Sequence, residues 1–236
     1  MPGGSNHVAD SSDGRSTGLA RIRVRRDQPG PRVRARCMCM AGLQANRRRI
    51  GAQIAEPFVK ALSHSPISPN ALTITGVVVT LAAAWLASEG RFLVSGIVLI
   101  GASLFDLLDG ALARATGKTS RFGGILDSTG DRISEAALLA GLSLWFAHDG
   151  NTTAVLVTYV ALISSFLVSY LRARGEALGI ECTVGLCTRP ERVIVLAVGL
   201  LTGFVFVAVS IVAFCASVTV VQRLLHLQRE GKESGN

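Results

Sequence analysis

The amino-acid sequence predicts an all-α membrane protein with six transmembrane helices, preceded by an amphipathic helix on the membrane surface. Hydrophobic residues form 49% of its 236 residues and charged residues only 17%, a balance too apolar for an ordinary soluble domain of this length. Six apolar runs follow Asn70, and most approach the roughly 20 residues that a helix needs to cross a hydrocarbon core of about 30 Å. In a soluble domain, six such runs with short links would leave little polar surface.

Residues 1–42 predict a disordered basic tail, because they are rich in Gly, Ser, Pro and Arg and show no helical or strand periodicity. Twelve of the 24 basic residues but only four of the 16 acidic ones precede residue 61. Basic tails can bind nucleic acid, but this chain has no RNA-binding motif, no zinc-ligand spacing and no aromatic residues between the basic ones. We therefore expect a solvated tail or one that contacts anionic lipid, and no nucleic-acid partner.

The expected membrane domain covers residues 43–228 and begins with the amphipathic helix. From Leu43 to His64, apolar residues recur near helical spacing among Arg and Lys residues, which is typical of a helix lying in the membrane surface. A plain cytoplasmic helix is the alternative, and Pro57 interrupts the backbone hydrogen bonds of either helix. The segment 68–70, Ser-Pro-Asn, then predicts a turn with Asn70 as the helix cap.

The six expected spans cover residues 71–88, 92–114, 124–146, 152–171, 193–201 and beyond, and 204–221. An even number of spans places both termini on one side of the membrane. Besides the tail, that side carries Arg114, Lys118, Arg121, Arg172, Arg174, Arg189, Arg192 and Arg223. Only Arg91 clearly falls opposite, so the positive-inside rule predicts cytoplasmic termini. We expect a multi-pass plasma-membrane protein that ends in a short cytosolic tail at residues 229–236.

Four aspartates stand on two helices that follow each other in the sequence. They are Asp106, Asp109, Asp127 and Asp131. At about 100° per residue, the two on each helix share one face. An ionised carboxylate at a helix centre in the membrane costs at least about 2.5 kcal/mol, so four of them need positive partners. Hard oxygen donors with spare valence predict two Mg²⁺ or Mn²⁺ ions. Carboxylates that merely face water or pair with Arg114 and Arg132 are the alternative.

These aspartates belong to the pattern DxxDGxxAR, eight further residues and GxxxDxxxD, which begins at Asp106. The pattern resembles the signature of the CDP-alcohol phosphotransferase family at every position, and the resemblance extends from about Leu43 to Gln228. It implies that all four aspartates hold two metal ions against the diphosphate of a CDP-linked donor. It also implies that Asp131 is the general base, that the active site faces the cytoplasm and that the protein forms a homodimer.

The same resemblance implies CDP-diacylglycerol as the donor. Small residues near the aspartates let a bulky ligand or a neighbouring helix approach the backbone closely. The positions that match the family's cytidine and phosphate contacts are Asn70, Thr73, Gly110, Ala113, Arg114, Thr119 and Gly123.

A second polar group follows the fourth span and predicts a phosphorylated acceptor. Its expected acceptor-binding residues are Ser169, Arg172, Arg174, Arg189, Pro190 and Arg192. Arginine forks bind phosphate oxygens through two parallel hydrogen bonds, although simple anchoring of positive loops is the alternative. The segments at 119–135, 169–174 and 189–192 resemble the phosphatidylinositol phosphate synthases within the family, whose acceptor is inositol 1-phosphate. Arg172 stands where those enzymes often have Lys, a change that keeps the charge but alters the geometry.

Another acceptor, another lipid donor and a transport function are the alternatives. Glycerol 3-phosphate is also a phosphorylated alcohol, and archaetidylinositol phosphate synthases use a different lipid donor. Serine, choline and ethanolamine carry no phosphate and fit the arginines less well. A divalent-cation transporter also places carboxylates in the membrane, but the chain shows no paired inverted halves with broken helices. A purely structural membrane protein would tolerate the change of Asp131 to Asn.

Overall fold

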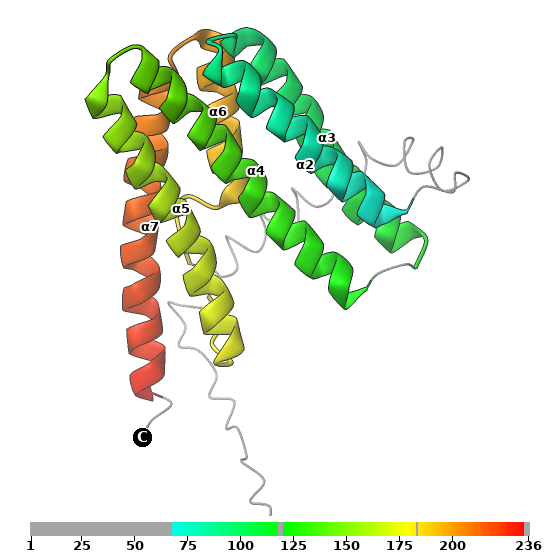
Figure 1. The fold of residues 1–236 in the computed structure, drawn as a ribbon. Coiled ribbons are helices and arrows are strands. Elements are labelled where there is room, and N and C mark those ends of the chain that lie inside the picture. Colours follow the sequence, from blue (N-terminus) through cyan, green and yellow to red (C-terminus); the bar gives the residue numbers. More distant parts are fainter. Residues whose placement is uncertain (1–67, 118–119, 183, 234–236) are drawn as a thin grey trace, which may run out of the picture. The chain divides into compact units, whose positions relative to one another are not determined.

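The computed structural model describes residues 68–117, 120–182 and 184–233. The predicted tail at 1–42 and the predicted surface helix at 43–64 lie outside the described residues. The described part is all-helical and contains no strand, as the sequence predicts. Its helices are α2 (Pro69–Ser88), α3 (Phe92–Ala115), α4 (Arg121–His148), α5 (Thr152–Ala177), α6 (Arg189–Thr202) and α7 (Val205–Glu233) (Figure 1).

Each expected span corresponds to one helix, and four of the helices in the described residues are long and apolar enough to cross a membrane. These are α2, α3, α5 and α7. The polar residues of the functional region lower the hydropathy of α4, while α6 has 14 residues and is therefore only about 21 Å long at 1.5 Å per residue. Helix α7 continues to Glu233 and therefore includes part of the segment 229–236 that the sequence predicts as a separate cytosolic tail.

Polar caps set the starts of three helices. The side chain of Ser120 accepts a hydrogen bond from the Gly123 N–H at 2.9 Å, and Asn151 accepts one from Ala154 at 3.0 Å. The prediction that Asn70 caps the first span is wrong. Pro69 occupies the first helical turn, where its missing N–H is no loss, so the preceding Ser68 is the cap.

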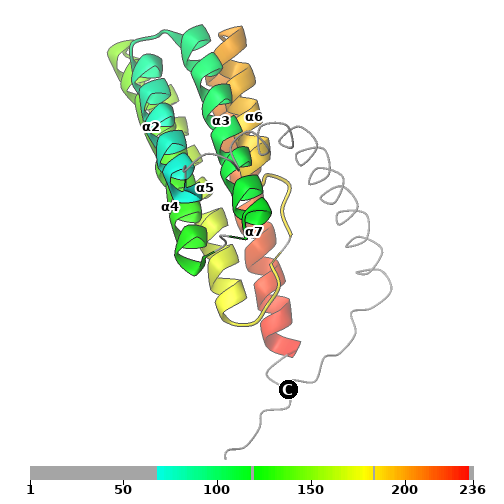
Figure 2. The same ribbon diagram turned by 90° about the vertical axis from the view of Figure 1, so that its right-hand side faces the viewer.

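The six helices contact one another in a closed order that differs from their order in the sequence. Following the main contacts, the order is α2, α3, α6, α7, α5, α4 and back to α2. Figures 1 and 2 show α2 beside α3, and α5 beside α7. Consecutive helices α3 and α4 both pack on α2, and α6 packs on α3. This order brings the start of α6 to the carboxylates of α3 and α4.

The apolar core gathers toward the end of the described bundle where α2 joins α3 and α4 joins α5. Trp145 packs edge-to-face on Phe92, with ring centroids 4.6 Å apart, and Phe146 packs similarly on Phe206 at 6.3 Å. Leu139, Leu142, Leu196 and Val209 are fully buried around these rings. The core holds this end of the helices together and leaves the opposite end for polar chemistry.

Candidate functional site

The four predicted aspartates lie at the ends of α3 and α4 that the short link between these helices joins. Asp109 is buried, Asp106 and Asp131 are partly buried and Asp127 is exposed. The carboxylates act on one another electrostatically across the two helices. The fold therefore brings all four into one acidic site, which combines two helix faces that the sequence predicts separately.

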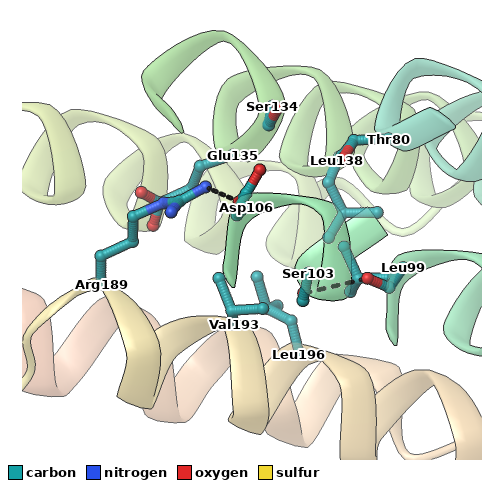
Figure 3. Close-up of a pocket in the computed structure, with 10 residues that line it drawn as sticks. All are labelled: Thr80, Leu99, Ser103, Asp106, Ser134, Glu135, Leu138, Arg189, Val193 and Leu196. Atoms are coloured by element: carbon teal, nitrogen blue, oxygen red, sulfur yellow. Dashed lines mark hydrogen bonds and ion pairs between the residues drawn. The ribbon is translucent and has the colours of Figure 1, made fainter. Parts of the chain in front are cut away.

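Arg189, the first residue of α6, links two of these carboxylates. One guanidinium nitrogen donates to Asp106 Oδ2 at 2.9 Å, and another lies 2.6 Å from Asp131 Oδ1. Figure 3 shows the Arg189 side chain reaching from α6 to Asp106. The arginine side chain is 29% exposed, so both ion pairs are partly shielded from solvent. The sequence predicts Arg189 as a phosphate ligand, whereas here it joins α6 to α3 and α4.

The remaining α3 carboxylate depends on α2. Thr73 donates its hydroxyl to Asp109 Oδ2 at 2.6 Å, and both side chains are buried. Gly76, one turn further along α2, lies so close to Asp106 that an added Cβ would stand 3.0 Å from Asp106 Oδ1. Helix α2 thus supports both aspartates of α3, one through a hydroxyl donor and one through the space that a glycine leaves.

The donor chemistry of the acidic site fits Mg²⁺ or Mn²⁺, because carboxylate oxygens are the ligands that both ions accept readily. Within the described residues, however, no three acidic, His or Cys side chains surround a common point at metal-binding distance. The hydrogen bonds explain this arrangement, since Arg189 holds Asp106 and Asp131 while Thr73 holds Asp109. Each of these contacts occupies one oxygen of its carboxylate, so metal binding would compete with them for the same groups.

Most of the residues predicted to bind the nucleotide surround the same end of α3 and α4. An added Cβ on Gly123 would stand 3.3 Å from Asn70 Oδ1, so the start of α2 lies next to the start of α4. Gly110 faces the guanidinium of Arg114 on its own helix, and Arg114 is exposed. Ala113 is partly exposed near them, whereas Thr119 lies outside the described residues.

The residues predicted to bind the acceptor come from the end of α5 and the start of α6. Ser169 is partly exposed, and Arg172 and Arg174 are exposed. Arg172 pairs with Glu176 one turn later at 2.8 Å, and both side chains are more than half exposed. Pro190 follows Arg189 in the first turn of α6. The guanidinium groups at the end of α5 are therefore exposed, whereas that of Arg189 at the start of α6 is already in ion pairs with two aspartates.

Arg192 differs from the other predicted acceptor residues because it is buried, with a side chain only 1% exposed. Its Nε and one terminal nitrogen donate to the two carboxylate oxygens of Glu135 at 2.5 and 2.8 Å. Its other terminal nitrogen donates to the Cys187 carbonyl at 3.1 Å. A phosphate-binding role for Arg192 would require it to exchange these partners, so in the present arrangement it fastens α6 to α4.

Sequence reasoning missed Glu135 and Arg223 as parts of this region. Arg223 on α7 is 3% exposed and donates to the carbonyls of Val184 and Val168, which ties the α5–α6 loop to α7. An arginine in an apolar helix is a signal in itself, because a charge inside a membrane needs a specific partner. Glu135 carries the same signal, since it continues the polar face of α4 beyond Asp131.

A small cavity of about 20 Å³, lined by Asp106, Arg189 and a mixture of polar and apolar side chains, lies next to the acidic site. Thr80, Ser103, Ser134 and Glu135 contribute its polar lining, and Figure 3 shows these side chains around it. Such a volume suffices for about one water molecule. The Nε of Arg189 is buried and has no hydrogen-bond partner among the described residues, so Arg189 can change its position without breaking a bond at that atom.

A family model of CDP-alcohol phosphatidyltransferases matches residues 66–222, which include both the acidic site and the arginine-rich segments. The chain belongs to the CDP-alcohol phosphatidyltransferase family. This result confirms the resemblance seen in the sequence and places the chain in a family of enzymes. Together with four helices apolar enough to cross a bilayer, it identifies a membrane protein.

Named relatives within the CDP-alcohol phosphatidyltransferase family cover most of the chain. The archaetidylinositol phosphate synthase of Pyrococcus horikoshii is 39% identical over 178 residues, which are 75% of this chain and 92% of that protein. The phosphatidylinositol phosphate synthase of Mycobacteroides abscessus is 37% identical over 194 residues, covering 78% and 87%. The two names share an inositol phosphate product and differ in the lipid.

Solved structures of another family member resemble the present fold. The phosphatidylinositol phosphate synthase of Mycobacterium tuberculosis with bound CDP-diacylglycerol gives a TM-score of 0.70 at 34% identity, covering 74% of this chain and 94% of that one. The same enzyme in complex with manganese and citrate also gives 0.70, covering 74% and 88%. CDP-diacylglycerol is the donor that the sequence predicts. Manganese is one of the two alternative metals, Mg²⁺ or Mn²⁺, that it predicts.

Proposed function

We propose that this enzyme transfers the phosphatidyl group of CDP-diacylglycerol to inositol 1-phosphate and releases phosphatidylinositol phosphate and CMP. The observation that carries the proposal is the single acidic site formed by the aspartates of α3 and α4, with the arginine at the start of α6 in direct contact with it. The names and bound donor of the relatives support the same reaction. The exposed arginines at the end of α5 favour an acceptor that carries a phosphate of its own.

In this proposal the four aspartates hold two divalent ions. When bound, the ions supply positive charge that neutralises the donor diphosphate and stabilises the leaving CMP. Thr73 fixes the orientation of Asp109, while Gly76 leaves room for Asp106 beside α2. The nucleotide would lie against the starts of α2 and α4 and the end of α3, and its proposed contacts are Asn70, Thr73, Gly110, Ala113, Arg114, Thr119 and Gly123.

Asp131 is the proposed general base of the transfer. A base must lie within hydrogen-bond reach of the hydroxyl whose proton it takes. Asp131 is partly exposed on α4, one turn after Asp127, and contacts the Arg189 guanidinium. A hydroxyl of the acceptor would donate its proton to a carboxylate oxygen of Asp131 as the new ester bond forms to phosphorus. The bond between that phosphorus and the CMP oxygen breaks in the same displacement.

The acceptor phosphate would lie between the end of α5 and the start of α6. Arg172, Arg174 and Ser169 are accessible there, and Arg189 stands between this region and the acidic site. Pro190 fixes the backbone of the first turn of α6, and Arg192 holds that helix to α4 through Glu135.

The acceptor is tested with purified protein, CDP-diacylglycerol and Mn²⁺, by offering one alcohol at a time and measuring CMP release. We expect release with inositol 1-phosphate and little with glycerol 3-phosphate, inositol or serine. Release only with glycerol 3-phosphate would instead identify a phosphatidylglycerophosphate synthase. A parallel reaction with CDP-archaeol in place of CDP-diacylglycerol tests the lipid, because one named relative acts on archaetidyl lipids. Metal-dependent flux of Mn²⁺ into vesicles without CMP release would favour a transporter.

A matched pair of variants tests the role of the acidic site. Asp131→Asn removes the proposed base and should lower turnover by at least a hundredfold, since general base catalysis contributes roughly 10²–10⁴-fold. Asp149→Asn makes the same chemical change at the opposite end of α4 and should leave turnover within about twofold. Equal activity of both variants would contradict the proposed role of Asp131.

We also propose that α4 and α6 complete six membrane spans and that the termini and the acidic site face the cytoplasm. The charge distribution supports this orientation, since the arginines of the site and of the predicted tail would lie together. A domain from about residue 43 to 228, a separate N-terminal tail and a homodimer belong to the same proposal. The mass of the purified protein in detergent measures the last of these.

A further inference from the structure

Arg189 pairs with two of the four carboxylates of the proposed metal site. Its guanidinium lies 2.9 Å from Asp106 Oδ2 and 2.6 Å from Asp131 Oδ1, and these aspartates come from different helices. One arginine therefore spans the space between α3 and α4. Arg132 also acts electrostatically on Asp127 and Asp131, but its guanidinium donates to the Ser128 carbonyl on its own helix. Among the described residues, Arg189 is the arginine that contacts carboxylates of both helices.

The ion pairs and metal ligation compete for the same atoms. A carboxylate oxygen that accepts a charge-assisted hydrogen bond has a fixed direction and part of its charge already compensated. A divalent cation requires that oxygen to point at the ion and brings a like charge close to the guanidinium, which repels it. Full metal binding and the present position of Arg189 are therefore mutually unfavourable.

Arg189 has the freedom to move that this competition demands. Its side chain is partly exposed, its Nε has no partner among the described residues, and it lines a cavity with room for about one water molecule. Figure 3 shows an extended side chain whose contact with Asp106 is made at the far end of the guanidinium. A rotation of the side chain breaks both ion pairs without moving α6, because Arg192 separately fastens that helix to Glu135.

We infer that Arg189 exchanges partners when the metals bind: it neutralises Asp106 and Asp131 beforehand, and the metals then release it to bind the phosphate of the acceptor. This inference rests on the proposed function. Its consequence is an order of events, because an Asp131 carboxylate that is paired with the Arg189 guanidinium is a weaker base than one released from it. The base and the phosphate-binding arginine become available together, once the metals are in place.

The exchange is tested by Mn²⁺ titration of the purified protein without donor or acceptor, with free Mn²⁺ followed by electron paramagnetic resonance. Arg189→Gln removes the competing cation and should bind Mn²⁺ about tenfold more tightly, a difference of about 1.4 kcal/mol. Arg121→Gln is the matched control, because it removes the same charge near the start of α4 but belongs to none of the ion pairs described for the aspartates. It should change the affinity by less than about twofold.

Thermal unfolding separates an exchange from a merely structural contact. In the presence of a chelator, Arg189→Gln should unfold at a lower temperature than the wild type, because Asp106 and Asp131 lose their cation. Mn²⁺ should then restore its stability to the wild-type value. Arg189→Lys, which keeps the charge but lacks a fork able to bridge two carboxylates, should lie between the two and guards against a variant that does not fold.

Each outcome decides between the hypotheses. Mn²⁺ binding by the Gln variant that is unchanged or weaker than in the wild type overturns the exchange, and so does a loss of stability that Mn²⁺ does not restore. Either result leaves the proposed reaction intact if CMP is still released by the wild type. A wild type that binds no Mn²⁺ at all overturns the metal site of the proposed function, and the exchange with it.

Discussion

At the scale of single residues, the buried pair of Arg192 and Glu135 determines how the start of α6 is held. Two charges removed from water cost free energy that only close, fully hydrogen-bonded geometry recovers. This pair meets that condition, because both carboxylate oxygens accept from the guanidinium and the remaining terminal nitrogen reaches a backbone carbonyl. The fixed helix then presents Arg189 to the acidic site, so Arg192 is a positioning residue in this arrangement.

Replacing Arg192 by Ala should destabilise the protein strongly. The change leaves Glu135 as an uncompensated charge in the interior, which typically costs about 3–5 kcal/mol. Arg172→Ala breaks the other Arg–Glu pair described, but that pair is more than half exposed and should cost about 1 kcal/mol or less. Chemical denaturation of both variants in detergent, followed by circular dichroism, measures the difference. Similar small losses would show that the buried pair does not hold α6.

The sequence predicts the acidic site better than its partners. Spacing on two helices indicates which faces carry the aspartates, because helical geometry is regular over such short distances. The partner of Asp106 is Arg189, which lies 83 residues later in the sequence. The spacing of residues on one helix contains no information on contacts between residues so far apart in the chain. Thr73 illustrates the same limit, since its hydrogen bond to Asp109, 36 residues later, does not follow from spacing either.

At the scale of helices, glycines determine how closely α2 and α4 approach. Gly141 lies against the backbone of Ala84, and an added Cβ would collide with the Ala84 carbonyl. Nearer the acidic site, a Cβ on Gly130 would stand 2.9 Å from the Val77 side chain. Close backbone approach between small residues is the main means of helix association in lipid, where the hydrophobic effect does not drive it.

Gly141→Ala should therefore destabilise the contact between α2 and α4, by about 1–3 kcal/mol as in other overpacked interiors. Gly101→Ala on α3 is the control, because no atom lies within 4 Å of an added Cβ there. It should leave stability unchanged or raise it by up to about 1 kcal/mol, since Ala favours helix more than Gly does. Thermal unfolding of the two variants tests this, and a stable Gly141→Ala protein would exclude a tight contact.

Helix positions follow from the sequence, while helix ends follow only in part. The apolar runs locate all six helices, because each helix has a long continuous apolar surface that packs on other helices or faces lipid. Their ends depend on local atoms instead. Ser68 rather than Asn70 caps α2. Helix α7 extends to Glu233, and within it His226 lies 3.1 Å from the Glu181 carbonyl of the α5–α6 loop.

At the scale of the whole molecule, the closed order of helix contacts explains why one end carries the chemistry. Helices that pack together are not always consecutive in the sequence. Helix α6 packs on α3 as well as on its successor α7, and α4 packs on α2 as well as on its successor α5. Length and hydropathy cannot predict this order, because an apolar helix surface can pack against lipid or against any other apolar helix. The arginine–carboxylate contacts across α3, α4 and α6 supply the missing specificity at the polar end.

The last prediction concerns the orientation of the molecule in the membrane. All five native cysteines are replaced, and a single cysteine is then introduced either at Asp149, in the exposed turn after α4, or at Lys232, near the end of α7. Because the basic residues should stay in the cytoplasm, a membrane-impermeant maleimide should label position 149 in intact cells and position 232 only after permeabilisation. Labelling of position 232 from outside would place the acidic site on the external face, where no cytoplasmic pool of CDP-linked donor could reach it.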